Sequence, residues 1–166
     1  MLGFLATGYL TEERLSTGDA FWPLAAIRFV FGADAVNSTV YLTAAGGALS
    51  VMALAPAFRA QRSAETVLRD VSWLSTALLF VLSPNYPWYF LILTPFVALI
   101  GGAPLWAFTV GAVVLQNEVV WDPSLPIMVR KSILYGAFLA ACGYAAWQRW
   151  RLRQEGASSD EPNTAR

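Results

Sequence analysis

The chain contains 166 residues, of which 57% are hydrophobic and 13% are charged, and its mean hydropathy is +0.50. Ordinary soluble domains carry about 25% charged residues, so this composition indicates a membrane protein. Eleven basic and eleven acidic side chains give no net charge, and therefore no field that would attract a nucleic acid. Histidine is absent and Cys142 is the one cysteine, which excludes an intramolecular disulfide and histidine-based acid–base chemistry. We expect neither a metal site nor a cofactor.

Residues 1–37 are predicted to form an outer-face loop that carries an interfacial or re-entrant helix. The apolar run at residues 19–31 has the length of such a helix and is too short to cross a membrane. A candidate N-cap, a proline tolerated in the first turn and a candidate terminating glycine support it. These three residues are, in order, Asp19, Pro23 and Gly32. The lone charge within the helix, Arg28, either anchors it at the membrane interface or binds the phosphate of a lipid.

Residues 38–150 are predicted to form an all-α bundle of about five transmembrane helices, because their apolar segments approach the roughly 20 residues of a spanning helix. The five predicted spans are residues 40–58, 64–82, 87–101, 105–120 and 127–147. Small residues in the first and last spans favour close helix packing. The glycines among them are Gly46, Gly47, Gly136 and Gly143. Residues 151–166 are polar and are predicted to form a disordered cytoplasmic tail.

Basic residues set the predicted orientation of this bundle. Arginines follow the first and the fifth span, and with five spans both groups lie on one side, which the positive-inside rule makes cytoplasmic. These arginines are Arg59, Arg62, Arg69, Arg149, Arg151 and Arg153. The sequence therefore predicts an integral membrane protein with a cytoplasmic C-terminus. Arg130 and Lys131 begin the fifth span on the outer side, against this rule, and are expected to extend their charges to the interface.

The most specific feature is an aromatic turn at residues 83–90, Ser-Pro-Asn-Tyr-Pro-Trp-Tyr-Phe, between the second and third spans. Pro84 and Pro87 fix their own φ angles and push the residues before them out of the helical region. One helix must end here, and another can begin at Pro87, where a missing N–H costs little. The turn also carries amphipathic rings of the kind that collects at the membrane–water boundary. These rings belong to Tyr86, Trp88 and Tyr89.

Residues 79–90, Leu-Phe-Val-Leu-Ser-Pro-Asn-Tyr-Pro-Trp-Tyr-Phe, followed by Thr94-Pro95-Phe96, resemble the SPxYPWYxxxxxP block of bacterial polyprenyl-phosphate-dependent mannosyltransferases. These are multi-spanning enzymes of the GT-C superfamily, in glycosyltransferase family 87 and its relatives. Looser similarity covers most of the chain. The resemblance implies the C-terminal part of such an enzyme, located in the bacterial inner membrane, with a polyprenyl-phosphate-linked sugar as donor and an acceptor at the outer face.

The resemblance also implies what the chain needs from elsewhere. Family members are longer and carry their catalytic acid in the first outer loop, a position that would precede Met1. Three outer-face carboxylates are candidate substitutes for this catalytic acid, although solvated loop charges are the simpler explanation. They are Glu12, Glu13 and Asp19. We therefore expect no catalytic residue in this chain and no sugar transfer by the chain alone. A separate chain that carries the remaining helices is a candidate partner, in addition to membrane lipid.

The candidate substrate- and lipid-binding residues are Arg28, Asn85, Tyr86, Trp88 and Tyr89. In the resembled enzymes the leaving group is a lipid phosphate, which cations and hydrogen-bond donors stabilise, and Trp88 can stack on a sugar or prenyl chain. Interface anchoring also explains the aromatic rings, and helix capping also explains Asn85. The alternative function is a small non-enzymatic integral membrane protein, such as a polyprenyl-lipid carrier subunit or an assembly partner.

Overall fold

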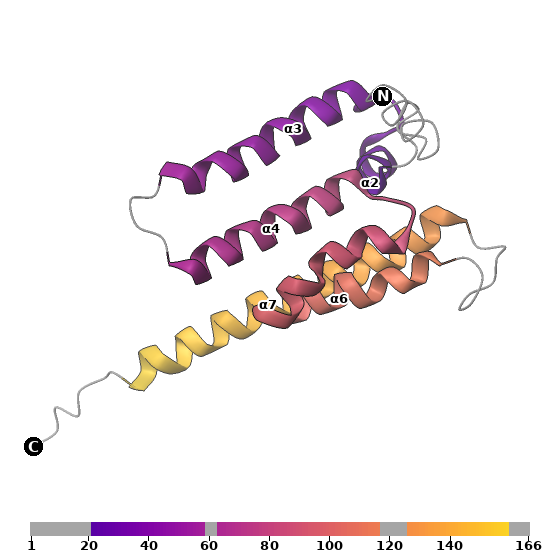
Figure 1. The fold of residues 1–166 in the computed structure, drawn as a ribbon. Helices are drawn as coiled ribbons and strands as arrows, with labels where there is room; N and C mark the ends of the chain where they lie inside the picture. The colour runs from indigo at the N-terminus through magenta and orange to yellow at the C-terminus, as the bar shows by residue number, and fades with distance from the viewer. Residues whose placement is uncertain (1–20, 59–62, 117–125, 160–166) are drawn as a thin grey trace, which may run out of the picture.

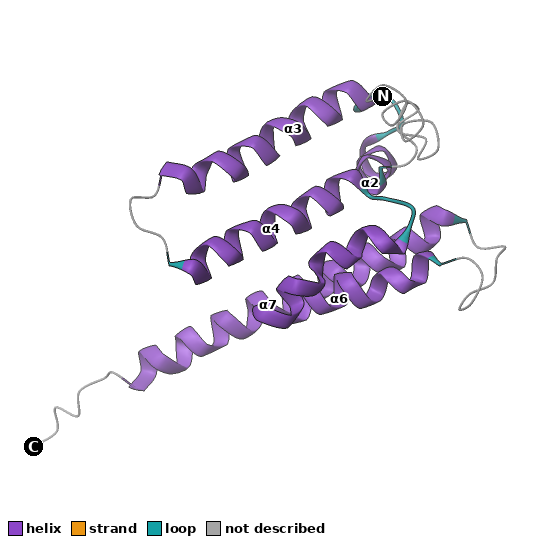
Figure 2. Ribbon diagram, viewed as in Figure 1, coloured by secondary structure: helices purple, strands orange, loops and turns teal. Residues whose placement is uncertain are grey.

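The computed structural model describes residues 21–58, 63–116 and 126–159. These residues form helices joined by short connections, with no strand among them, which confirms the all-α prediction. The long helices lie side by side in a bundle (Figures 1 and 2).

The first described helix, α2, spans Trp22–Phe31 and is close to the short helix predicted at residues 19–31. Phe21 occupies the N-cap position without a side-chain hydrogen bond, and the proline falls in the first helical positions. The helix ends at Gly32, whose φ of 103° is accessible to glycine at low cost. The predicted cap, Asp19, lies outside the described residues.

The next two helices match the first two predicted spans. Helix α3 (Ser38–Leu54) continues as the 3₁₀ segment η1 (Ala55–Phe58), and α4 covers Ala64–Leu82. Each begins at a side-chain cap, in which Asn37 and Ser63 accept hydrogen bonds from backbone N–H groups three residues later. In the part of the chain that the structure describes, residues 38–58 form the one helix that is long and apolar enough to cross a membrane, with a mean hydropathy of 1.5 over its best window.

The third and fourth predicted spans are shorter than expected and partly 3₁₀-helical. The third consists of η2 (Pro87–Leu93) and α5 (Thr94–Leu99), and the fourth of α6 (Ala103–Gly111) and η3 (Ala112–Leu115). Gly101 and Gly102 join them with φ angles of 68° and 104°, as a tight reversal requires. Residues 117–120, which the fourth span was expected to include, lie outside the described residues.

The last helix, α7, runs without interruption over Ile127–Ser159, a length of 33 residues. The prediction of a disordered tail from residue 151 is therefore wrong for residues 151–159. Local contacts account for this extension, because Arg151 pairs with Glu155 one turn later at 3.2 Å and stacks over the Trp147 ring at 5.1 Å. The second half of α7 extends past the other helices (Figure 1).

The main core lies where α6 packs along α7 and η2 and α4 cover them. Its fully buried members include Phe90, Leu93, Phe108, Leu134 and Tyr135. Close backbone approach occurs at Gly111, where an added Cβ would lie 2.9 Å from Leu134 Cδ1. The four glycines predicted to allow such packing have open space beside them, so that prediction is wrong for contacts within the described chain.

Candidate functional site

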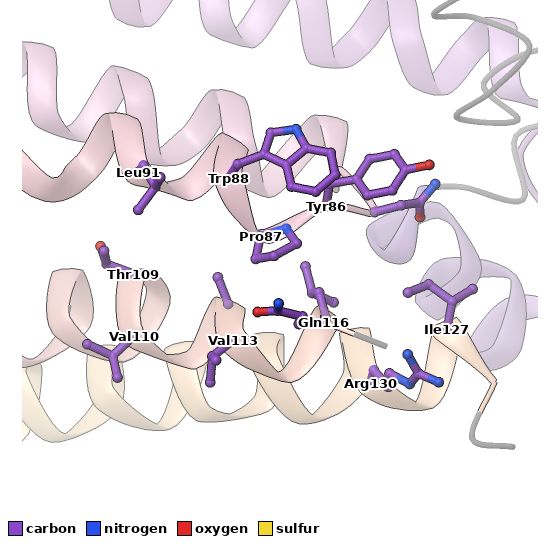
Figure 3. Close-up of a pocket in the computed structure, with 13 residues that line it drawn as sticks. Tyr86, Pro87, Trp88, Leu91, Thr109, Val110, Val113, Gln116, Ile127 and Arg130 are labelled. Atoms are coloured by element: carbon purple, nitrogen blue, oxygen red, sulfur yellow. The ribbon is translucent and has the colours of Figure 1, made fainter. Parts of the chain in front are cut away.

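A pocket of about 1120 Å³ lies between the aromatic turn and the facing ends of η3 and α7. Residues 85–88 and Leu91 form one wall, residues of α6 and η3 between Thr109 and Gln116 form the opposite wall, and Ile127 and Arg130 of α7 close one end (Figure 3). Most of these side chains are apolar. The pocket brings together segments far apart in the sequence, which the prediction of a turn alone did not reveal.

The backbone of the turn follows the sequence-based expectation. Helix α4 ends at Ser83, a left-handed residue with φ 48° and ψ 55°, whose N–H bonds to the Leu79 carbonyl at 2.9 Å. The chain is then extended at Tyr86, the N-cap of η2, and helical structure resumes at Pro87. Asn85 precedes this N-cap, and η2 has no side-chain capping bond, so helix capping does not account for Asn85.

The predicted aromatic residues divide between two cavities on either side of the turn. The rings of Tyr86 and Trp88 stack with 4.3 Å between centroids and 12° between planes, and both residues line the large pocket. Trp88 remains 57% exposed. Tyr89 instead lines a smaller cavity of about 170 Å³, together with Pro84 and residues of α4.

Arg28 is not a lining residue of either cavity. Its guanidinium Nε donates to the Val36 carbonyl at 3.0 Å, which joins the end of α2 to the segment that leads into α3. The structure therefore gives Arg28 a bond to the backbone, and it does not bring Arg28 together with Asn85, Tyr86 and Trp88.

The structure overturns the expectation that Arg130 and Lys131 extend to the interface. Arg130 is 2% exposed and lines the large pocket, and Lys131 is 0% exposed. The Lys131 ammonium donates a hydrogen bond to the Ser83 carbonyl at the end of α4. Sequence reasoning treated the two cations as a surface pair, although their placement in the first two turns of an apolar helix was a signal that they face neighbouring helices.

The end of α4 explains why a buried ammonium is stabilised there. The carbonyls of a helix's last turn lack intrahelical donors, and the prolines that follow Leu82 have no N–H to offer. Side chains from two other helices add donors at this end: Tyr41 of α3 donates to the Val81 carbonyl at 2.8 Å, and Tyr135 of α7 donates at 3.1 Å to the Leu79 carbonyl, which also accepts the Ser83 N–H. The positive charge of Lys131 also interacts favourably with the negative end of the α4 dipole.

The pocket is suited to a ligand with an anionic head and an apolar body. Among the described residues that line it, Arg130 is the one charged side chain, and no carboxylate is present. Thr109 Oγ1 is buried in the same lining, with no hydrogen-bond partner among the described residues. In the described ranges, Cys, Asp and Glu do not cluster in threes that could hold a metal ion.

Comparisons of the chain with protein-family models, curated proteins and solved structures find no match.

Proposed function

We propose that this chain is the membrane portion of a glycosyltransferase that binds a polyprenyl-phosphate-linked sugar in the pocket beside the aromatic turn. The observation that carries the proposal is the position of Arg130, which lines a mostly apolar pocket of about 1120 Å³ with the Tyr86–Trp88 stack. Pockets for drug-sized ligands measure about 300–1000 Å³. The volume is therefore sufficient for a phosphosugar and the first units of a prenyl chain.

Each part of such a donor has a matching surface. A guanidinium binds phosphate oxygens through paired N–H groups, which assigns the phosphate to Arg130. The exposed face of Trp88 suits the sugar or the first prenyl units. Leu91, Val110 and Val113 supply an apolar wall for the chain. All are exposed, as expected of side chains that contact a lipid.

The chemistry assigned to this chain is stabilisation of the leaving group. When an acceptor hydroxyl attacks the anomeric carbon, the bond from that carbon to the phosphate oxygen breaks, and the phosphate gains negative charge. A cation beside that oxygen stabilises the transition state more than the ground state. The hydroxyl proton needs a base, and the described lining contains no carboxylate. We therefore assign donor binding, and not proton transfer, to these residues.

The same proposal places the bundle in the bacterial inner membrane, with the aromatic turn at the outer face and the C-terminus in the cytoplasm. Large apolar side chains are exposed on several helices, and exposed apolar surface on this scale suits contact with lipid. Examples are Leu54, Ile92, Leu99, Trp106 and Leu139. The shorter helices cross with local thinning of the bilayer or with snorkelling flanks.

Binding to the purified chain in lipid nanodiscs tests the proposal. The probes are polyprenyl-phosphate mannose, polyprenyl phosphate, the uncharged polyprenol and mannose 1-phosphate. We expect the phosphorylated lipids to bind and the polyprenol to bind at least tenfold more weakly. Arg130→Gln should remove this preference, whereas Arg151→Gln, an exposed arginine paired with Glu155, should retain it.

The same measurement separates the two candidate functions. Tighter binding of the sugar-bearing lipid than of polyprenyl phosphate supports a donor site. Equal binding of the two favours the non-enzymatic polyprenyl-lipid carrier. Equal binding of polyprenol and polyprenyl phosphate contradicts both functions.

A further inference from the structure

We infer that Lys131 is a positioning residue, which locks the aromatic turn in place and thereby sets the width of the adjacent pocket. The inference about geometry rests on the contacts of α4, α7 and the turn. Its consequence for ligand affinity rests on the proposed function.

Lys131 binds a carbonyl that has no donor within its own helix. In a continuing helix, the N–H of the fourth residue after Ser83 would bond to the Ser83 carbonyl. That fourth residue is Pro87, which has no N–H. Ser83 is 0% exposed, so water does not reach this carbonyl freely. The Lys131 ammonium supplies the donor, and an unsatisfied buried carbonyl is costly.

The hydrogen bonds between α7 and α4 repeat at a spacing of one helical turn. Lys131 and Tyr135 lie four residues apart on α7, and they donate to carbonyls that lie four residues apart along the end of α4, those of Ser83 and Leu79. Four residues correspond to about one helical turn. Two hydrogen bonds one turn apart fix both the distance and the rotation of α7 relative to α4.

The residues next to Lys131 and Ser83 line the large pocket. Arg130 directly precedes Lys131 on α7 and lines the pocket, while Asn85 and Tyr86 follow Ser83 by two and three residues and line it on the side of the turn. Figure 3 shows Arg130 on the opposite side of the pocket from Tyr86 and Trp88. The hydrogen bond from Lys131 to Ser83 thus joins the side of the pocket formed by α7 to the side formed by the aromatic turn. Without it, the cation and the aromatic stack are no longer held at a fixed separation.

The hydrogen bond from Tyr135 to the Leu79 carbonyl provides a matched control. Tyr135→Phe removes an α7-to-α4 hydrogen bond of the same kind, but at Leu79, whose carbonyl also accepts the Ser83 N–H. Ser132→Ala removes the bond from Trp22 Nε1 to Ser132 Oγ, at the residue next to Lys131. Both variants can lower stability without freeing the turn.

The test is ¹⁹F NMR of the full chain in nanodiscs, labelled with 5-fluorotryptophan and measured without ligand. The Trp88 resonance is assigned as the signal that Trp88→Phe removes. Lys131→Met, which retains the length of the side chain and removes its donor, should shift or broaden this resonance and leave those of Trp147 and Trp150 unchanged. Tyr135→Phe and Ser132→Ala should leave the Trp88 resonance in place. An unchanged Trp88 resonance in Lys131→Met, or an equal change in Tyr135→Phe, would overturn the inference.

If Lys131→Met does not accumulate as folded protein, Lys131→Gln provides a shorter side chain that retains an N–H donor. Because the shorter side chain holds the Ser83 carbonyl only part of the time, the Trp88 resonance of Lys131→Gln should be shifted from the wild-type position or broadened by exchange. A Trp88 resonance identical to that of the wild type would overturn the inference. Lys131→Met or Lys131→Gln should also weaken polyprenyl-phosphate binding by at least fivefold, although Arg130 is retained. Because the NMR experiment uses no ligand, its test of the Lys131–Ser83 contact does not depend on the proposed function.

Discussion

The indole ring of Trp22 lies nearly parallel to the phenol ring of Tyr135, with 4.7 Å between the ring centroids and 15° between the planes. The Trp22 Nε1 also donates to Ser132 Oγ at 2.9 Å. Tyr135 in turn lies within the main core, where Phe80 and Phe108 contact its ring edge-on. This stack attaches α2 to α7, so the short helix is a packed part of the bundle.

Trp22→Ala should lower the free energy of unfolding by about 3 kcal/mol, because it removes a large ring from a core contact. The matched control is Trp106→Ala, since Trp106 is 55% exposed and should cost less than about 1 kcal/mol. Unfolding followed by circular dichroism in mixed detergent measures both. Equal losses in the two variants would show that α2 is not held by this stack.

Gly111→Ala should destabilise the protein by about 1–3 kcal/mol through overpacking. The added Cβ would lie 2.9 Å from Leu134 Cδ1, and Leu134 is itself fully buried. Gly143→Ala is the control, because open space surrounds Gly143 and alanine favours a helix over glycine by about 1 kcal/mol. The double variant Gly111→Ala/Leu134→Val should recover part of the loss. Stabilisation by Gly111→Ala alone would contradict this account of α6–α7 packing.

The proposed orientation predicts that the turn is accessible from outside the cell. In a Cys142→Ala background, cysteine at Asn85 should react with a membrane-impermeant maleimide in intact cells, whereas cysteine at Gln61 should react only after lysis. Gln61 lies between the first two predicted spans, in the arginine-rich segment assigned to the cytoplasm. Labelling of both positions to the same extent would exclude this topology.

Trp88→Phe should weaken binding of polyprenyl-phosphate mannose by about tenfold, since stacking or polar contacts worth about 1.4 kcal/mol are lost. Asn85→Ala, also in the pocket lining, should have a similar effect through a lost hydrogen bond. Trp106→Phe, an exposed indole outside this lining, should bind like the parent. The affinity is measured in nanodiscs, with thermal stability recorded in parallel. Weaker binding in proportion to lost folded protein would identify the turn as an anchor only.

The features that the sequence predicted well are those that depend on local backbone chemistry. Proline and glycine act within one or two residues, so the ends of α2 and α4 and the restart at Pro87 agree with the structure. The 3₁₀ character of η2 and η3 was not predicted, because it depends on how these short segments pack against α4 and α7. Apolar composition does not distinguish the two helix types.

The parts of the site that the sequence missed depend on contacts between distant residues. The Lys131–Ser83 bond spans 48 positions, and a cation at the end of an apolar helix is equally consistent with a surface anchor. Arg28 had two interpretations, and its bond to the Val36 carbonyl follows from the path of the chain after Gly32. The extension of α7 was missed for a different reason: its support comes from contacts one turn apart, Arg151 with Glu155 and Arg151 over Trp147, whereas the prediction considered only a hydrophobic core.

Helix α7 is longer than the bundle against which its first half packs (Figure 1). Its 33 residues correspond to roughly 50 Å, whereas the hydrocarbon core of a bilayer is about 30 Å thick. Arg130 lies near the first residue of this helix, and the exposed Trp150 and Leu152 lie in its C-terminal part. In the proposed membrane orientation, the excess length carries Trp150 and Leu152 to the cytoplasmic interface, where an indole ring is favoured.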